Sequence, residues 1–290
     1  MTARPREPAR YLGLELSGAK NQKTAVAALE YYPRESKVFL LDIFERIAGR
    51  QATGSRQSTQ TGDEALLEVL GELTEEHDPG SVHLGVNVPL SLPPCSECTR
   101  KTCPMPRSCT VPAVKWMRSN SRRHAKNLDF TPYTQRPAEL WVRHHVIERL
   151  PESHRFEIDE ALGGNKAPLT MRMHFLMRHL PNLHVIEAWP KLTIACLAAE
   201  LGLSKRVVSS YRSLEEGAHS REEILEALTE KRGIFIYERD LTKLSTNLAS
   251  FDAFVCALTA LLADTDRCEK APHGFPENAG WVHYPLENPG

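Results

Sequence analysis

The chain has 290 residues, of which 41% are hydrophobic and 25% are charged. This composition is typical of a globular protein and excludes a wholly disordered, collagen-like or coiled-coil chain. Lys and Arg number 36 against 37 Asp and Glu, so the overall charge predicts neither a nucleic-acid nor a membrane partner. No apolar run approaches the roughly 20 residues of a transmembrane helix. The basic, Pro-rich start lacks the apolar region of a signal peptide, so we expect a cytoplasmic protein.

The cysteines favour the same compartment. There are seven, an odd number, and they comprise one cluster and three isolated residues. This pattern is not typical of a secreted disulfide framework. The cluster occupies 15 residues and consists of Cys95, Cys98, Cys103 and Cys109.

The first part of the chain predicts three strands, at residues 10–16, 24–30 and 37–44. Short polar links join them, which predicts an antiparallel meander. Residues 1–9 are expected to form a disordered tail, and residues 10–290 a single domain.

A helix and a fourth strand are expected next. Leucines recur at helical spacing from Asp63 to about residue 78. Residues 81–88 then predict a strand. Because a helix precedes it, this strand should lie parallel to the first. The chain is therefore expected to be an α/β protein with a mixed sheet, three antiparallel strands followed by parallel strands, flanked by helices.

The second half of the chain is predicted to be mainly helical. Residues 89–136 are rich in Pro, Cys and Arg and predict an irregular, Cys-rich basic insertion. Beyond them we expect helices at residues 137–150, 167–180, 190–201, 220–232 and 247–263, and strands at residues 183–188 and 281–284. We assign no role to residues 203–219.

Five segments, taken in order, resemble domain of unknown function 429, a family described as predicted nucleases with an RNase H-like fold. They are YLGLELSGAK at 11–20, LGVNVPLSLP at 84–93, VIEAWP at 185–190, SFDAFVCALTALLA at 250–263 and GWVHYP at 280–285. Together they extend the resemblance across nearly the whole chain. The resemblance implies an RNase H-like mixed sheet that carries the four-cysteine insertion.

The resemblance also implies an acidic metal site. RNase H-like enzymes place carboxylates on the first strand, the fourth strand, a later strand and the final helix, where they hold one or two divalent ions. Such ions activate water and stabilise the leaving oxygen of a phosphodiester. The matching positions here are Glu15, Asn87, Glu187 and Asp252, and the expected ion is Mg²⁺ or Mn²⁺.

Two of these positions depart from the family pattern, which usually has Asp at both. Glu15 is a longer carboxylate, whereas Asn87 is a neutral amide that should weaken metal binding. The alternative interpretation is structural. Glu15 and Glu187 can each be ion-paired within the sheet, and Asp252 can simply favour the start of a helix.

The cysteine cluster predicts a second, separate metal site. Four thiolates in one short loop suit a closed tetrahedral metal. Structural zinc is the first expectation, a [4Fe–4S] cluster the second, and four reduced thiols the alternative. A site closed by four cysteines leaves no position for water, so this metal would not be the hydrolytic one. Because the loop follows the fourth strand, we expect it at the rim of the acidic site, where it could shape a substrate channel.

A basic stretch accompanies this loop. From Cys95 to Lys126 there are eight Lys or Arg residues and one acidic residue. Cations interleaved with an aromatic side chain suit a nucleic-acid backbone; the alternative is a solvated basic face that offsets the thiolates. Farther along, Arg136, Glu139 and Arg143 are expected to be i,i+4 partners on a helix surface. The expected nucleic-acid-binding residues are Lys115, Trp116, Arg118, Arg122, Arg123 and Lys126.

Taken together, these features predict a metal-dependent nuclease that hydrolyses phosphodiester bonds. The alternative is a non-catalytic nucleic-acid-binding protein with a degenerate RNase H-like site and a structural four-cysteine loop. A weaker third hypothesis is phosphoryl transfer or small-nucleotide hydrolysis on the same core, since a fold does not fix a substrate.

Overall fold

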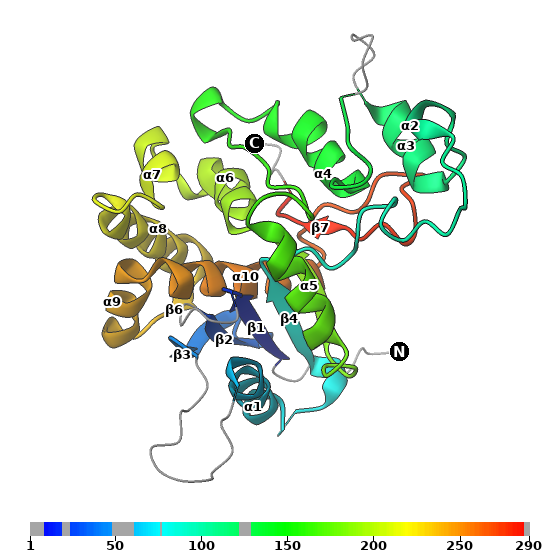
Figure 1. Ribbon diagram of the computed structural model, residues 1–290. Coiled ribbons are helices and arrows are strands. Elements are labelled where there is room, and N and C mark those ends of the chain that lie inside the picture. The colour runs from blue at the N-terminus through cyan, green and yellow to red at the C-terminus, as the bar shows by residue number, and fades with distance from the viewer. Residues whose placement is uncertain (1–8, 19–23, 48–60, 76, 122–128, 287–290) are drawn as a thin grey trace, which may run out of the picture.

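Alternating apolar residues build one mixed sheet in this protein. The computed structural model describes residues 9–18, 24–47, 61–75, 77–121 and 129–286. The sheet has seven strands in the order β6-β3-β2-β1-β4-β5-β7 (Figure 1). The strands are β1 (Ala9–Glu15), β2 (Ala25–Tyr32), β3 (Lys37–Phe44), β4 (Val82–Val86), β5 (His184–Ala188), β6 (Ile234–Phe235) and β7 (Val282–His283). Residues 1–8 of the expected tail lie outside the described residues, and Ala9 already belongs to β1.

The strand directions confirm the predicted α/β class and mixed sheet. β1, β2 and β3 form the antiparallel meander. β4 lies on the other side of β1 and runs parallel to it, as the helical crossover requires. β5 and β7 continue the parallel half of the sheet. β6, which pairs in parallel with β3, was not predicted because two residues are too few to show a periodic pattern.

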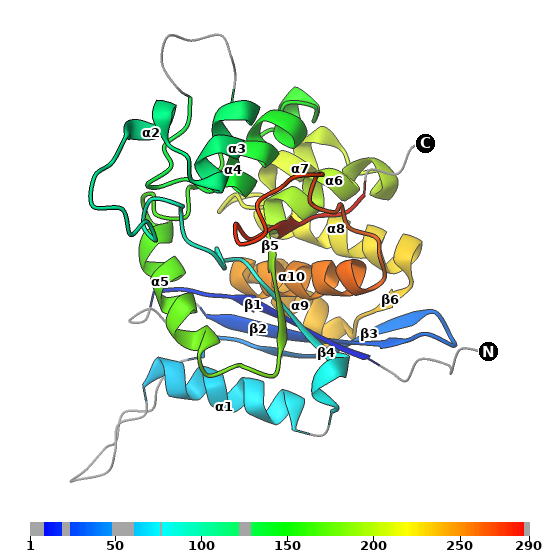
Figure 2. The same cartoon turned by 90° about the vertical axis from the view of Figure 1, so that its right-hand side faces the viewer.

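Helices cover both faces of the sheet (Figure 2). One face packs on α10, the long apolar helix that the spacing of its large apolar residues predicts, and the other packs on α1 and α5. The helices are α1 (Gly62–Thr74), α2 (Met105–Ser108), α3 (Pro112–Asn120), α4 (Pro137–Trp141), α5 (Lys166–Met177), α6 (Pro190–Leu201), α7 (Lys205–Ser210), α8 (Gly217–Arg232), α9 (Glu238–Thr246) and α10 (Leu248–Asp264). Three shorter helical segments are η1 (Pro79–Ser81), the π-helical η2 (Val142–Ile147) and η3 (Glu152–His154).

Two glycines bring α10 directly onto the sheet. A Cβ at Gly13 would lie 1.8 Å from the carbonyl oxygen of Ala253, and one at Gly85 would lie 2.2 Å from that of Cys256. Only glycine permits so close an approach of helix backbone to strand backbone. The contact therefore fixes Asp252, one residue before Ala253, close to the carboxyl end of β1.

Two segments that were expected to be irregular contain helices. The insertion at 89–136 includes α2 and α3, and both begin with a proline in their first turn, which pre-sets the helical φ. The unassigned segment 203–219 includes α7, which begins after Ser204, whose side chain accepts a hydrogen bond from the backbone N–H of Val207. Short helices of this kind lack the repeated apolar spacing on which the sequence analysis relied.

Among the described residues, no single helix is long and apolar enough to cross a membrane. α9 and α10 reach the required length and hydropathy only together, and they meet at an angle of 111°.

Candidate functional site

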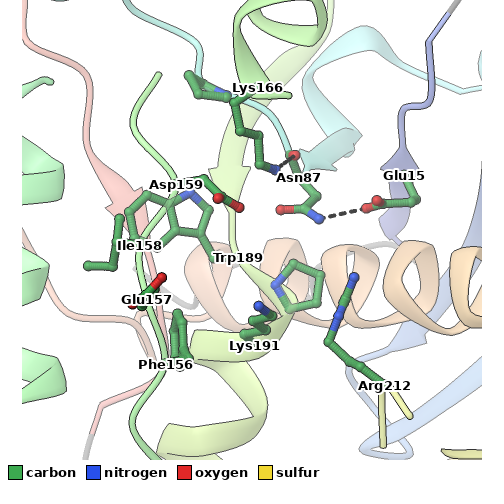
Figure 3. Close-up of a pocket in the computed structure, with 12 residues that line it drawn as sticks. Glu15, Asn87, Phe156, Glu157, Ile158, Asp159, Lys166, Trp189, Lys191 and Arg212 are labelled. Atoms are coloured by element: carbon green, nitrogen blue, oxygen red, sulfur yellow. Dashed lines mark hydrogen bonds between the residues drawn. The ribbon is translucent and has the colours of Figure 1, made fainter. Parts of the chain in front are cut away.

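The carboxyl ends of β1 and β4 bring Glu15 and Asn87 together. The backbone N–H of Asn87 donates to the carbonyl oxygen of Leu14 over 3.2 Å, which continues the parallel pairing by one residue. Residues 15 and 87 therefore emerge on the same face of the sheet, toward α10. Here the Asn87 side-chain Nδ2 donates a hydrogen bond to Glu15 Oε2 over 2.7 Å (Figure 3).

Asp252 joins this pair from α10. Its side chain is only 1% exposed. Burial, together with the negative charge of Asp252, raises the pKa of Glu15 to about 7. Burial also raises the pKa of Asp252, against the opposing effect of Arg212. Asp252 Oδ1 has no hydrogen-bond partner among the described residues. Two neighbouring carboxylates repel one another, and the buried oxygen has no donor. Both conditions favour a bound proton or cation.

Three cations surround the carboxylates. Arg212 Nη1 forms an ion pair with Asp252 Oδ2. Lys166 Nζ donates to the backbone oxygen of Asn87 over 3.0 Å. Burial and the nearby charge of Arg212 lower the pKa of Lys191. All three cations line the same cavity as Asn87, with a volume of about 170 Å³.

None of these three cations is predicted as a site residue by the sequence. Lys166 and Lys191 stand in the first turns of α5 and α6, and Arg212 follows α7. They come from three separate elements and meet only through tertiary packing, so no spacing in the sequence could have indicated them.

A loop and an aromatic side chain form the far wall of the cavity. Residues 156–159 and Trp189 lie across it from Glu15 (Figure 3). The Lys191 ammonium lies 5.6 Å from the centre of the Phe156 ring, a cation–π contact. The cavity therefore combines the Glu15 carboxylate, a cationic rim and a far wall of mixed character, in which apolar side chains stand beside the carboxylates of Glu157 and Asp159.

Glu187, by contrast, does not join the acidic group. In the sheet register Glu187 is paired with Val86, whose side chain packs on the face covered by α1 and α5. Successive residues of a strand point to opposite faces, so Glu187 points away from the face that carries Glu15 and Asn87. The resemblance placed Glu187 on the correct strand, but the register directs its side chain to the wrong face for this site.

The Glu187 carboxylate is instead fully occupied by a buried ion pair. Arg136 donates to Oε1 from Nη2 and to Oε2 from Nη1, each over 2.7 Å. The backbone N–H of Leu90 and the Trp189 indole N–H donate over 3.0 and 2.9 Å. Of the two alternatives stated for this residue, the structure shows the ion pair.

The expected surface pair Arg136 and Glu139 belongs to the same buried network, so this prediction was wrong. Arg136 Nε lies 2.8 Å from Glu139 Oε1, and both side chains are fully buried. Burial raises the pKa of Glu139, against the opposing charge of Arg136. The prediction rested on i,i+4 spacing, whereas Arg136 and Glu139 pair at i,i+3, and Arg143 Nη2 instead lies 3.9 Å from Glu160 Oε1.

The four clustered cysteines do not form a metal site in the structure. Cys98 and Cys103 are exposed, Cys95 is half-buried and Cys109 is buried. Burial and the charges of the other three thiols raise the pKa of Cys95, so the four lie within electrostatic range of one another. Even so, no group of three or more His, Cys, Asp or Glu side chains is placed to hold a metal ion anywhere in the described part of the chain.

The cysteine loop also lies apart from the acidic cavity. Cys98 lines a different cavity, of about 600 Å³, together with residues 275–279 near the C-terminus. The two cavities share no lining residue. The expectation that this loop borders the acidic site is therefore not met.

The basic residues that follow the cysteines have mixed placements. Trp116 packs between Trp141 and Phe275, with ring centres 5.9 and 5.1 Å apart, so its ring is engaged in the core. Arg118 donates to three backbone oxygens of residues 106–109 and holds the cysteine loop in place. Lys115 is exposed. Arg122, Arg123 and Lys126 lie outside the described residues.

The acidic group offers oxygen atoms, the kind of ligand that a hard divalent cation prefers. Glu15 and Asp252 supply two carboxylates, and the Asn87 side-chain oxygen faces the cavity (Figure 3). Mg²⁺ is commonly bound through one or two carboxylates, with water and substrate phosphate completing its coordination. The unpartnered Asp252 Oδ1 is the observation that favours such an ion.

Comparison of the chain with protein-family models, curated proteins and solved structures gives no significant match.

Proposed function

We propose that this protein is a metal-dependent nuclease that hydrolyses phosphodiester bonds in the cavity between β1, β4 and α10. The observation that carries the proposal is the Glu15–Asp252 pair, with the buried and unpartnered Oδ1 of Asp252, beside three cations. Carboxylates that hold a divalent ion, next to cations that bind phosphate, are what phosphodiester hydrolysis requires.

The fold supports the proposal at a coarser level. An antiparallel β3-β2-β1 meander followed by parallel β4 and β5 is compatible with the RNase H-like fold implied by the resemblance. We therefore propose that the sheet is RNase H-like and that the cavity occupies the position of the acidic site in that fold. Because fold alone does not fix function, the side chains of the cavity carry the argument.

Glu15, Asp252 and the side-chain oxygen of Asn87 would hold the metal, Mg²⁺ or Mn²⁺. When bound, the ion would supply Lewis-acid activation of water and neutralise charge on the phosphate. Asn87 contributes no negative charge, so two of the four positions matched by the resemblance would supply a carboxylate to the ion. The cations Lys166, Lys191 and Arg212 would bind the phosphate.

Metal binding at Glu15 would be linked to the pH. The metal-free carboxyl group has a pKa of about 7, so an ion that binds near neutral pH would displace a proton from it. Asn87 orients the group by donating to Oε2. Residues 156–159 and Trp189 close the side of the cavity opposite Glu15.

A direct test is cleavage of single- and double-stranded DNA and RNA with Mg²⁺ or Mn²⁺, with EDTA as the control. Asp252→Asn and Glu15→Gln should each lower the rate by roughly 100-fold or more, since a lost ligand removes several kcal/mol of transition-state stabilisation. Asp266→Asn, which changes an exposed aspartate paired with Lys270, should cut at the wild-type rate. Cleavage that survives EDTA, or that persists in Asp252→Asn, would contradict the proposal.

A second candidate is a nucleic-acid-binding protein without catalysis. The observation that favours it is the occupation of Glu187 by Arg136, which leaves two carboxylates at the site. Under this reading the cavity cations bind phosphate, and the variants Lys166→Ala and Arg212→Ala lose binding although no substrate is cut. A zinc ion or [4Fe–4S] cluster at the four cysteines also stays a proposal, and it requires the loop to draw its thiols together.

A further inference from the structure

A histidine pair lies at the other end of the sheet from the acidic cavity. His83 and His184 are register partners near the starts of β4 and β5. Their Nδ1 atoms are 3.0 Å apart, and the rings are nearly perpendicular, at 83°. Two neighbouring parallel strands thus direct imidazole nitrogens toward one another, and the proposed nuclease reaction uses neither.

The surroundings of His83 fix its orientation. The Tyr11 ring stacks on it, with ring centres 5.4 Å apart and planes at 23°. Asp264 Oδ1 lies 3.5 Å from His83 Nε2, and the Tyr11 hydroxyl donates to Asp264 Oδ2 over 2.8 Å. A carboxylate accepts hydrogen bonds, so it favours a proton on Nε2 of His83. The lone pair of His83 is then on Nδ1, the atom that faces His184.

We propose that His83 and His184 chelate a divalent transition-metal ion of the Zn²⁺, Ni²⁺ and Cu²⁺ class. Imidazole nitrogen suits these ions. Metal–nitrogen bonds of roughly 2.0–2.1 Å place two ligand nitrogens about 2.9–3.4 Å apart for angles between square and tetrahedral. The observed separation of 3.0 Å falls in that range.

The exposed His184 ring can turn to direct its nitrogen at the ion. Water completes the coordination, because the described residues offer no third ligand group here. Asp264 is the positioning residue: a carboxylate behind a ligating histidine fixes the tautomer and raises the basicity of the ligand. This arrangement distinguishes the pair from two histidines that are merely neighbours on a surface.

The inference does not depend on the proposed nuclease. Mg²⁺ prefers oxygen ligands, whereas this site offers nitrogen. The two sites also stand at opposite ends of β4, since His83 is near its start and Asn87 follows its end. Loss of one site should leave the other intact.

The test is a titration of the full chain with Ni²⁺, followed by NMR of its ¹⁵N-labelled histidine side chains. The paramagnetic ion should broaden the His83 and His184 resonances before those of the other histidines. His184→Ala should abolish the site without leaving a buried gap, and His273→Ala, which removes an exposed loop histidine, should retain it. Nickel bound at the cysteine loop would broaden other signals and would persist in His184→Ala.

A second variant tests whether the carboxylate behind His83 contributes to metal binding by the histidine pair. Asp264→Asn should weaken Ni²⁺ binding by about 10–100-fold, as measured by calorimetry, because the carboxylate behind His83 is lost. If the two histidines are not broadened first, or if His184→Ala binds Ni²⁺ as the wild type does, the proposal is overturned. The contact would then be only a hydrogen bond between two imidazoles.

Discussion

The side-chain amide of Asn87 donates to Glu15 Oε2 over 2.7 Å, at a position where the family pattern usually has Asp. The amide therefore relieves a carboxylate that already faces Asp252. A third carboxylate would add repulsion unless a cation were bound. If the proposed metal site forms, the residue at position 87 sets a balance between metal affinity and the stability of the metal-free protein.

The variant Asn87→Asp tests this balance. We expect it to bind Mg²⁺ more tightly than the wild type and to melt at a lower temperature without metal, because like charges repel in a buried group. Thermal melts with and without Mg²⁺ measure both effects. If added Mg²⁺ raises the melting temperature of the variant no more than that of the wild type, residue 87 does not face the ion.

The raised pKa of Glu15 predicts a pH-dependent stability. The folded-state pKa of about 7 exceeds the ordinary value of 4.5, so the folded state binds the proton more tightly than the unfolded state. Stability from this group is therefore fully present below about pH 4.5 and is lost as the pH rises through 7. Glu15→Gln should remove that loss and be roughly 1–3 kcal/mol more stable than the wild type at pH 8.

Urea denaturation of both proteins at pH 5 and pH 8 measures this difference. Equal stability changes between the two pH values in wild type and Glu15→Gln would show that the Glu15 carboxyl group titrates normally.

The Arg136–Glu187 pair is predicted to act in stability. Arg136→Met leaves two buried carboxylates without their cationic partner, which should cost about 3–5 kcal/mol. Arg239→Met, which removes an arginine that is 69% exposed beside Asp240, should change stability far less, because solvent screens an exposed ion pair. Chemical denaturation compares the two. Similar small losses in both variants would contradict the structural role of Arg136.

The close contact of α10 with β1 predicts that replacing glycine by alanine destabilises the protein at one position and not at another. Gly13→Ala should unfold the protein or destabilise it by more than about 3 kcal/mol, because its Cβ would overlap the Ala253 carbonyl oxygen. Gly71→Ala places a Cβ in open space on α1 and should stabilise the protein by up to about 1 kcal/mol. Melting temperatures of the two variants provide the measurement, and a tolerated Gly13→Ala would disprove the contact.

Thiol reactivity tests the arrangement of the cysteine loop. Exposed Cys98 and Cys103 should be alkylated first, Cys95 more slowly because its pKa is raised, and buried Cys109 last. Peptide mapping after timed alkylation gives the order. Uniform protection of all four, reversed by a chelator, would show instead that a metal gathers them.

Much of the fold could be predicted from the sequence. The strands β1 to β5 and helix α10 carry strong periodic or alternating patterns. The helix between β3 and β4 requires β4 to run parallel to β1. The convergence of Glu15, Asn87 and Asp252 also follows once the resemblance places them at strand ends and on the last long helix.

The remainder depends on contacts that no local pattern encodes. Lys166, Lys191 and Arg212 meet only when three helical elements pack around one cavity. Glu187 does not join the acidic group because successive residues of a strand point to opposite faces of the sheet. Its neighbours along β5, Ile186 and Ala188, face α10, so Glu187 faces the other way. A match of sequence segments identifies the strand but not the face toward which a side chain points.

The most direct test of the central claim is Mn²⁺ binding followed by electron paramagnetic resonance. The wild-type protein should hold one Mn²⁺ that Mg²⁺ displaces, and Asp252→Asn should lose it while Asp266→Asn retains it. If Asp252→Asn binds Mn²⁺ as the wild type does, or if neither protein binds it, the Glu15–Asp252 pair is not a metal site and the nuclease proposal fails with it.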